Sequence, residues 1–165
     1  MSIVIERVHA ASPALSAFLA AHHEEISGTA PPESIHALPL DRLLVPGVRL
    51  FAGFSDGQAV ATGALVALDE GHEELKSMRT DPAVRGQGVG RAMLSFLIGD
   101  AESRGISRIS LETGSDDFFV PARALYARIG FEECGPFGRY RPDPNSTFMS
   151  LAPLSASRLS PDGRR

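Results

Sequence analysis

The chain has 165 residues, 43% of them apolar and 22% charged, a composition that fits one globular domain with its own hydrophobic core. Its formal net charge of −4, with no cluster of lysine and arginine, argues against a nucleic-acid partner. The single cysteine, Cys134, excludes an internal disulfide and a cysteine-based metal cluster, and we expect its side chain to be partly buried.

The first half of the chain is predicted to consist mainly of strands. Residues 3–8 alternate in part between apolar and polar side chains, as an edge strand does. Ser12 and Pro13 form a good helix N-cap and first turn, and the helix that they start is expected to end at Ser27-Gly28. A proline-rich loop follows. Further elements are predicted at residues 40–45 (a short helix) and at 48–54, 58–68 and 74–80 (three strands).

The second half is predicted to alternate between helices and strands. A helix that ends at Arg104-Gly105 is predicted from a single apolar face. That face is formed by Val89, Met93, Phe96, Leu97 and Ala101. After it we expect a strand over 106–113, a helix over 121–129 and strands at 131–134 and 147–151. This order predicts an α/β sandwich with a mostly antiparallel sheet and one parallel crossover. Residues 155–165 have little to bury, so we expect a flexible tail.

Three alternate glycines stand just before that helix, in Arg85-Gly86-Gln87-Gly88-Val89-Gly90-Arg91. A glycine inside a helix costs about 0.5–1 kcal/mol relative to alanine, and arginines beside a helix N-terminus oppose its dipole. Both features are explained if an anion binds there, because free amides and arginines can hold phosphate oxygens. The spacing is neither that of a P-loop nor that of a dinucleotide fingerprint. A plain glycine-rich turn is the alternative.

The glycine loop matches the R/Q-x-x-G-x-G/A motif of the GNAT acetyltransferases. The segments E-L-K-S-M-R-T-D-P before it and A-L-Y-A-R-I-G-F after it stand at the family's usual distances. The chain therefore resembles this family over nearly its whole length, and one bacterial subgroup of it through residues 31–38, 111–114 and 136–149. The resemblance implies a mixed, mostly antiparallel sheet of six or seven strands with about four helices and a splay between strands 4 and 5. It also implies a single N-acetyltransferase domain over residues 1–154.

The same resemblance implies acetyl-CoA as co-substrate and no metal. In the family the fourth strand pairs through its backbone with the pantetheine arm, and the matching residues are Met78, Arg79 and Thr80. The pyrophosphate is expected on the loop formed by Arg85, Gly86, Gln87, Gly88, Val89, Gly90 and Arg91. Many relatives carry an asparagine where this chain has Phe119, so we do not expect that side-chain contact to the pantetheine. Phe118 and Phe119 are instead candidates to line the acyl or acceptor cavity.

The resemblance also suggests the catalytic residues. Tyr126 matches the tyrosine that often protonates the departing CoA thiolate, with a core tyrosine as the alternative. An ammonium must lose a proton before it attacks, and Glu74 is our candidate base, with Glu112 in the neighbouring strand as its rival. Either carboxylate could instead pair with a nearby lysine or arginine. His36 and Ser34, in the proline-rich loop, are candidate contacts to the acceptor.

The expected function is direct acetyl transfer from acetyl-CoA to a primary amine of a small molecule, in a ternary complex. The alternatives are a non-catalytic acyl-CoA sensor, an acetyltransferase acting on protein N-termini or lysines, and a domain that binds another nucleotide phosphate. No stretch approaches the roughly 18 apolar residues of a membrane-spanning helix, and no signal peptide is evident. We therefore expect a cytoplasmic protein without membrane contact and, as is frequent in this family, a homodimer.

Overall fold

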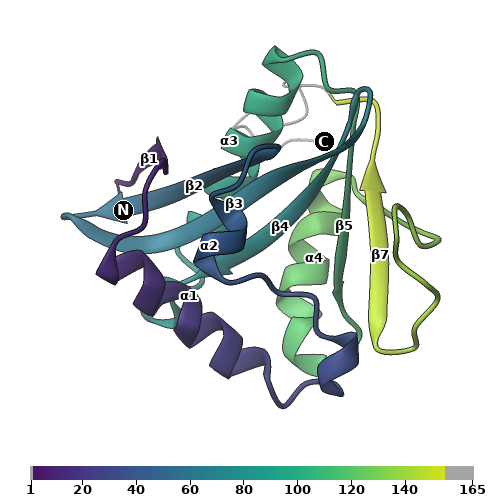
Figure 1. Ribbon diagram of the computed structural model, residues 1–165, viewed down its shortest axis with the longest axis horizontal. Helices are drawn as coiled ribbons and strands as arrows, with labels where there is room; N and C mark the ends of the chain where they lie inside the picture. Colours follow the sequence, from purple (N-terminus) through teal and green to yellow (C-terminus); the bar gives the residue numbers. More distant parts are fainter. Residues whose placement is uncertain (1, 155–165) are drawn as a thin grey trace.

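The computed structural model describes residues 2–154, which form one seven-stranded sheet with helices on both faces (Figure 1). The strand order is β1-β2-β3-β4-β5-β7-β6; β4 and β5 are parallel, and the other neighbouring pairs are antiparallel. The strands are β1 (Val4–Arg7), β2 (Val48–Ser55), β3 (Gln58–Asp69), β4 (His72–Thr80), β5 (Arg108–Gly114), β6 (Glu132–Cys134) and β7 (Ser146–Leu151). The α-helices are α1 (Pro13–Ile26), α2 (Leu40–Leu43), α3 (Val89–Ser103) and α4 (Val120–Ile129). The expected GNAT-type fold is confirmed.

Strand alternation divides the core into two layers. Leu50 and Ala64 pack under α1 and α2, whereas Phe51 and Leu65, their neighbours in β2 and β3, pack under α3 and α4. Successive side chains of a strand point to opposite faces of the sheet, so both faces of the central strands are buried. Among the described residues, no helix has the length and apolarity needed to cross a membrane.

The sheet splays between β4 and β5. These strands pair only from His72 to Leu75 and from Arg108 to Leu111, whereas β4 continues beside β3 to Thr80 and β5 continues beside β7 to Gly114. A bulge in β4 accompanies the separation, because Ser77 has a positive φ of 55° and the register with β3 shifts there. Bulges bend a strand and end its pairing. The far halves of β4 and β5 therefore leave backbone groups facing each other unpaired.

Several local expectations were wrong. Phe96 is 40% exposed and packs edge-on against Phe51, and Leu94 and Ile98 take the buried positions of α3 instead. The fifth strand begins at Arg108, because the amide of Ile106 first closes the end of α3 by donating to the carbonyl of Ala101 over 3.0 Å. Cys134 is exposed on β6, a short strand at the edge of the sheet. The expected tail lies outside the described residues.

Candidate active site

The glycine loop ends in a helix N-terminus with free amides. Gly86 and Gly88 have positive φ values of 79° and 82°, a conformation that only glycine adopts without strain. Gly88 is the N-cap of α3 and provides no side-chain hydrogen bond, so the first amides of the helix have no capping partner. A Cβ atom added at Gly86 or Gly88 would meet nothing within 4 Å. The loop therefore presents unpaired donors and a positive helix end to open space, as an anion site requires.

Arg79, before the glycine loop, and Arg85, its first residue, have different surroundings. Arg79 is buried, lies over the ring of Phe18 and donates two hydrogen bonds to Glu25, at 3.0 and 2.6 Å. Its side chain thus ties β4 to α1, which leaves only its backbone for a ligand. Arg85 is exposed and reaches the other oxygen of Glu25 over 2.9 Å. An exposed pair of this kind is weak, so an incoming phosphate can compete for Arg85.

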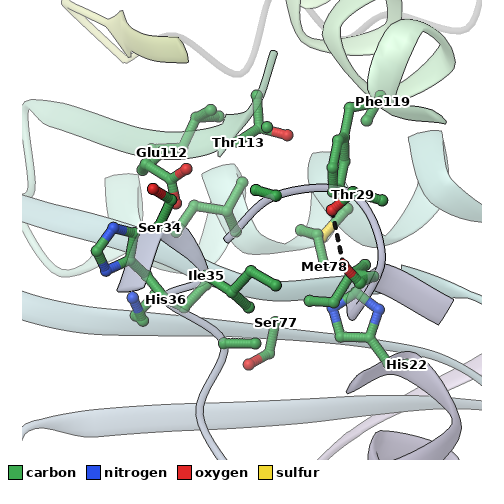
Figure 2. A pocket seen from close by; sticks show the side chains of 18 of the residues that line it. His22, Thr29, Ser34, Ile35, His36, Ser77, Met78, Glu112, Thr113 and Phe119 are labelled. Atoms are coloured by element: carbon green, nitrogen blue, oxygen red, sulfur yellow. Dashed lines mark hydrogen bonds between the residues drawn. The ribbon is translucent and has the colours of Figure 1, made fainter. Parts of the chain in front are cut away.

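A cavity occupies the splay between β4 and β5 (Figure 2). Its walls come from these two strands, from α1, from the loop between α1 and α2, and from α4. Met78 and Phe119 contribute apolar side chains, whereas Phe118 is exposed and does not line the cavity, contrary to expectation. The cavity brings together Glu74, Glu112, Tyr126, His36 and Ser34, the sequence candidates from four separate segments.

Glu74 is held by two donors inside this cavity. It is only 6% exposed, and its Oε2 accepts a hydrogen bond from the hydroxyl of Tyr140 over 2.5 Å and another from Lys76 Nζ over 3.3 Å. Lys76 Nζ also donates to the Tyr140 hydroxyl over 2.9 Å. The sequence analysis missed Tyr140, which stands 66 residues after Glu74. The only sequence signal was its place within the subgroup motif at residues 136–149.

Glu112 and Tyr126 face the cavity from β5 and α4. Burial raises the pKa of Glu112 to about 7, and the nearby charges of Glu74 and Asp143 add to the rise. Tyr126 is 6% exposed, and burial, followed by the charge of Glu112, raises its pKa well above the ordinary value. Tyr126 is thus a protonated phenol at neutral pH, and Glu112 is a carboxyl group that can gain and lose a proton there.

The loop between α1 and α2 closes the remaining side of the cavity. The ring of His36 stands edge-on to Tyr140 with centroids 4.9 Å apart, and burial, then the charge of Lys76, lowers its pKa. Ser34 is buried beside Asn145, whose side-chain nitrogen lies 3.4 Å from Ser34 Oγ. A second hollow, lined in part by Arg139 and Arg141, shares His36 and Glu74 with the cavity. These two residues therefore stand where the hollows meet.

Comparisons with known proteins agree with this geometry. The model of the acetyltransferase (GNAT) family matches residues 11–131. YsnE of Bacillus subtilis, an uncharacterized N-acetyltransferase, is 44% identical over 129 residues, which cover 78% of this chain and 85% of that protein. A crystal structure from Klebsiella pneumoniae superposes with a TM-score of 0.74 at 32% identity, covering 93% of this chain and 98% of the other. A GNAT family acetyltransferase from Elizabethkingia anophelis, solved with acetyl-CoA bound, superposes with a TM-score of 0.66 at 16% identity. The match covers 91% of this chain and 97% of that protein. The chain therefore belongs to the GNAT family of acetyltransferases.

Proposed function

We propose that the protein transfers an acetyl group from acetyl-CoA to a primary amine of a small molecule, by direct attack within a ternary complex. One observation carries the proposal, the order in space of three features. The glycine loop comes first, then the unpaired half of β4, and then the cavity lined by two carboxylates and a buried tyrosine. That order matches the order of pyrophosphate, pantetheine and thioester along acetyl-CoA. The structural neighbour from Elizabethkingia anophelis has this molecule bound.

The described residues fit the co-substrate. The amides from Gly86 to Arg91 and the side chains of Arg85 and Arg91 are available for the pyrophosphate, because the loop faces open space and both arginines are exposed. The backbone of Met78, Arg79 and Thr80 lies on the side of β4 that β5 has left. The amides of a pantetheine arm can pair there as an added strand. Acetyl-CoA supplies the activated acetyl group as its thioester.

The cavity then provides the proton transfers. A carboxylate of the splay, Glu74 or Glu112, accepts a proton from the acceptor ammonium, and Tyr126 donates one to the departing sulfur. Cys134 is exposed and lines neither hollow, which supports direct attack over an acyl-cysteine intermediate. His36 and Ser34 contact the acceptor where it enters. The junction of the two hollows at His36 and Glu74 is consistent with a small acceptor.

Release of free CoA in the presence of a panel of primary amines tests the proposal. We expect turnover with at least one small amine, and we expect Tyr126→Phe to lower kcat about 100-fold, since a positioned acid contributes this much. Unchanged binding of acetyl-CoA by the variant would show that the site is intact. A protein that binds acetyl-CoA tightly but acetylates nothing in broad panels of amines and peptides would be a sensor, and the proposal would be wrong.

A further inference from the structure

Two carboxylates face the same cavity from neighbouring strands. Glu74 pairs in register with Ser110, and Glu112 lies two residues further along β5, so all three side chains share one face of the sheet. Glu74 stands where the pairing of β4 and β5 is about to end, and Glu112 stands just beyond its end. The two groups differ in their partners, and that difference separates their roles.

Glu74 is fixed in position by its contacts. It accepts hydrogen bonds from Tyr140 and Lys76, and the ammonium of Lys76, whose side chain is only 12% exposed, compensates its charge. Tyr140 is itself held in place by edge-on packing against Phe137 and by its contact with Phe148. These contacts define where the carboxylate of Glu74 lies in the cavity. Glu74 is therefore better suited to hold the acceptor in place than to exchange a proton with it.

Glu112 has no ion pair of this kind. Within residues 2–154 it has no salt-bridge partner within 4 Å, although it is half-buried. The charged and titratable groups around it are Lys76 and Glu74 from β4, Asp143 and Tyr140 from the loop before β7, and Tyr126 from α4. Burial, with Glu74 and Asp143, raises its pKa to about 7 against the opposing effects of Ser146 and Lys76. A base with that pKa is efficient at neutral pH.

We propose that Glu112 accepts the proton of the acceptor ammonium, while Glu74, held in place by Tyr140 and Lys76, is the group that binds this ammonium. This division of roles rests on the proposed function. One proton passes from nitrogen to Glu112 and later to solvent, and the nitrogen lone pair forms the C–N bond to the thioester carbon. As the C–S bond breaks, the sulfur takes the phenol proton of Tyr126. Tyr126 then receives the second nitrogen proton, so an amide and free CoA remain.

Ethylamine and its 2-fluoro, 2,2-difluoro and 2,2,2-trifluoro derivatives are suitable probes. These amines have similar shapes, but each fluorine makes the ammonium more acidic. Trifluoroethylamine is therefore largely the free amine at neutral pH, and no base is needed to remove a proton before it attacks. We expect Glu112→Gln to lower kcat for ethylamine about 100-fold or more and to change kcat for trifluoroethylamine by only a few fold. We expect Glu74→Gln to raise KM for ethylamine more than it lowers kcat.

The pH dependence gives a second readout. With the native protein, kcat for ethylamine should rise through the neutral range, where Glu112 loses its proton, and Glu112→Gln should lack this step. Glu133→Gln, a change of an exposed carboxylate on β6, is the matched control and should behave as the native protein. An unchanged kcat and an unchanged step in Glu112→Gln, or a loss of kcat across the whole amine series in Glu74→Gln, would overturn the proposal.

Infrared titration tests the role of Glu112 independently of acetyl transfer, so it remains informative if no amine is acetylated. A carboxyl band that disappears through the neutral range should be present in the native protein and in Glu74→Gln, and absent in Glu112→Gln. If none of the amines is acetylated but this pattern is seen, the proposed function fails while the assignment of the proton-accepting carboxylate stands. If the neutral-range band is missing, or if it is lost in Glu74→Gln only, the assignment is wrong.

Discussion

The two faces of β4 hold buried carboxylates in different surroundings. Glu73 and Glu74 are adjacent in β4 and equally buried, but they point to opposite faces. Glu73 accepts two hydrogen bonds from Arg104, at 2.9 and 2.7 Å, and Arg104 also pairs with Asp100, which holds Arg49. Glu74 faces the cavity of the splay and meets Glu112 there. Burial of a carboxylate thus indicates function only where its neighbours form a cavity instead of a closed ion-pair network.

The largest effect on stability is expected on the face of β4 that carries Glu73. Glu73→Gln should lower the free energy of unfolding by about 2–3 kcal/mol, because it removes one of the two carboxylates that pair with Arg104. The value is below that of a fully buried pair because the side chain of Arg104 is 27% exposed. Urea denaturation measures the change. If Glu74→Gln destabilises the fold more than Glu73→Gln does, the contrast between the two faces is wrong.

On the cavity face, Tyr140→Phe should affect binding of the acceptor more than the stability of the fold. The substitution keeps the ring among its aromatic neighbours but removes the hydrogen bond to Glu74. A hydrogen bond to a charged group contributes about 1.5–3 kcal/mol, and Lys76 retains part of that effect. We therefore expect KM for the amine to rise roughly tenfold, with kcat and the unfolding midpoint changing less. Steady-state kinetics alongside thermal unfolding, with Tyr140→Leu as the variant that also loses packing, separates the two effects.

The smallest expected effect is the contribution of Asp100 to the loss of stability at low pH. Burial alone would raise the pKa of Asp100, but hydrogen bonds from Arg49 and Arg104 outweigh it and hold the pKa below its ordinary value. A carboxyl with a lower pKa in the folded state contributes stability above its unfolded pKa, and this contribution is lost as pH falls through the folded value. Asp100→Asn should therefore reduce stability at pH 7 by about 1 kcal/mol and flatten the decline below about pH 4. An equally steep decline in the variant would contradict this account of the ion pairs around Arg104.

Local signals made most of the fold predictable, and contacts between distant segments made the rest unpredictable. Ser12 caps α1 by accepting from the amide of Leu15, as its position before Pro13 indicated. The glycine loop was also visible, because its positive φ values demand glycine. The contact between Tyr140 and Glu74 was not predictable, because a sequence does not show which distant hydroxyl will reach a given carboxylate. Phe96 was misplaced because spacing alone does not define where the sheet stops covering α3.

Calorimetric binding of acetyl-CoA to the native protein and to Gly88→Glu tests the central claim most directly. A glutamate there places bulk and negative charge among the free amides at the start of α3. Gly57→Glu is the matched control, because Gly57 has a similar φ of 77° and equally open surroundings in the turn between β2 and β3. The account predicts that the native protein and Gly57→Glu bind acetyl-CoA and that folded Gly88→Glu does not. No binding by the native protein, or equal binding by folded Gly88→Glu, would contradict the assignment of the glycine loop as the acetyl-CoA site.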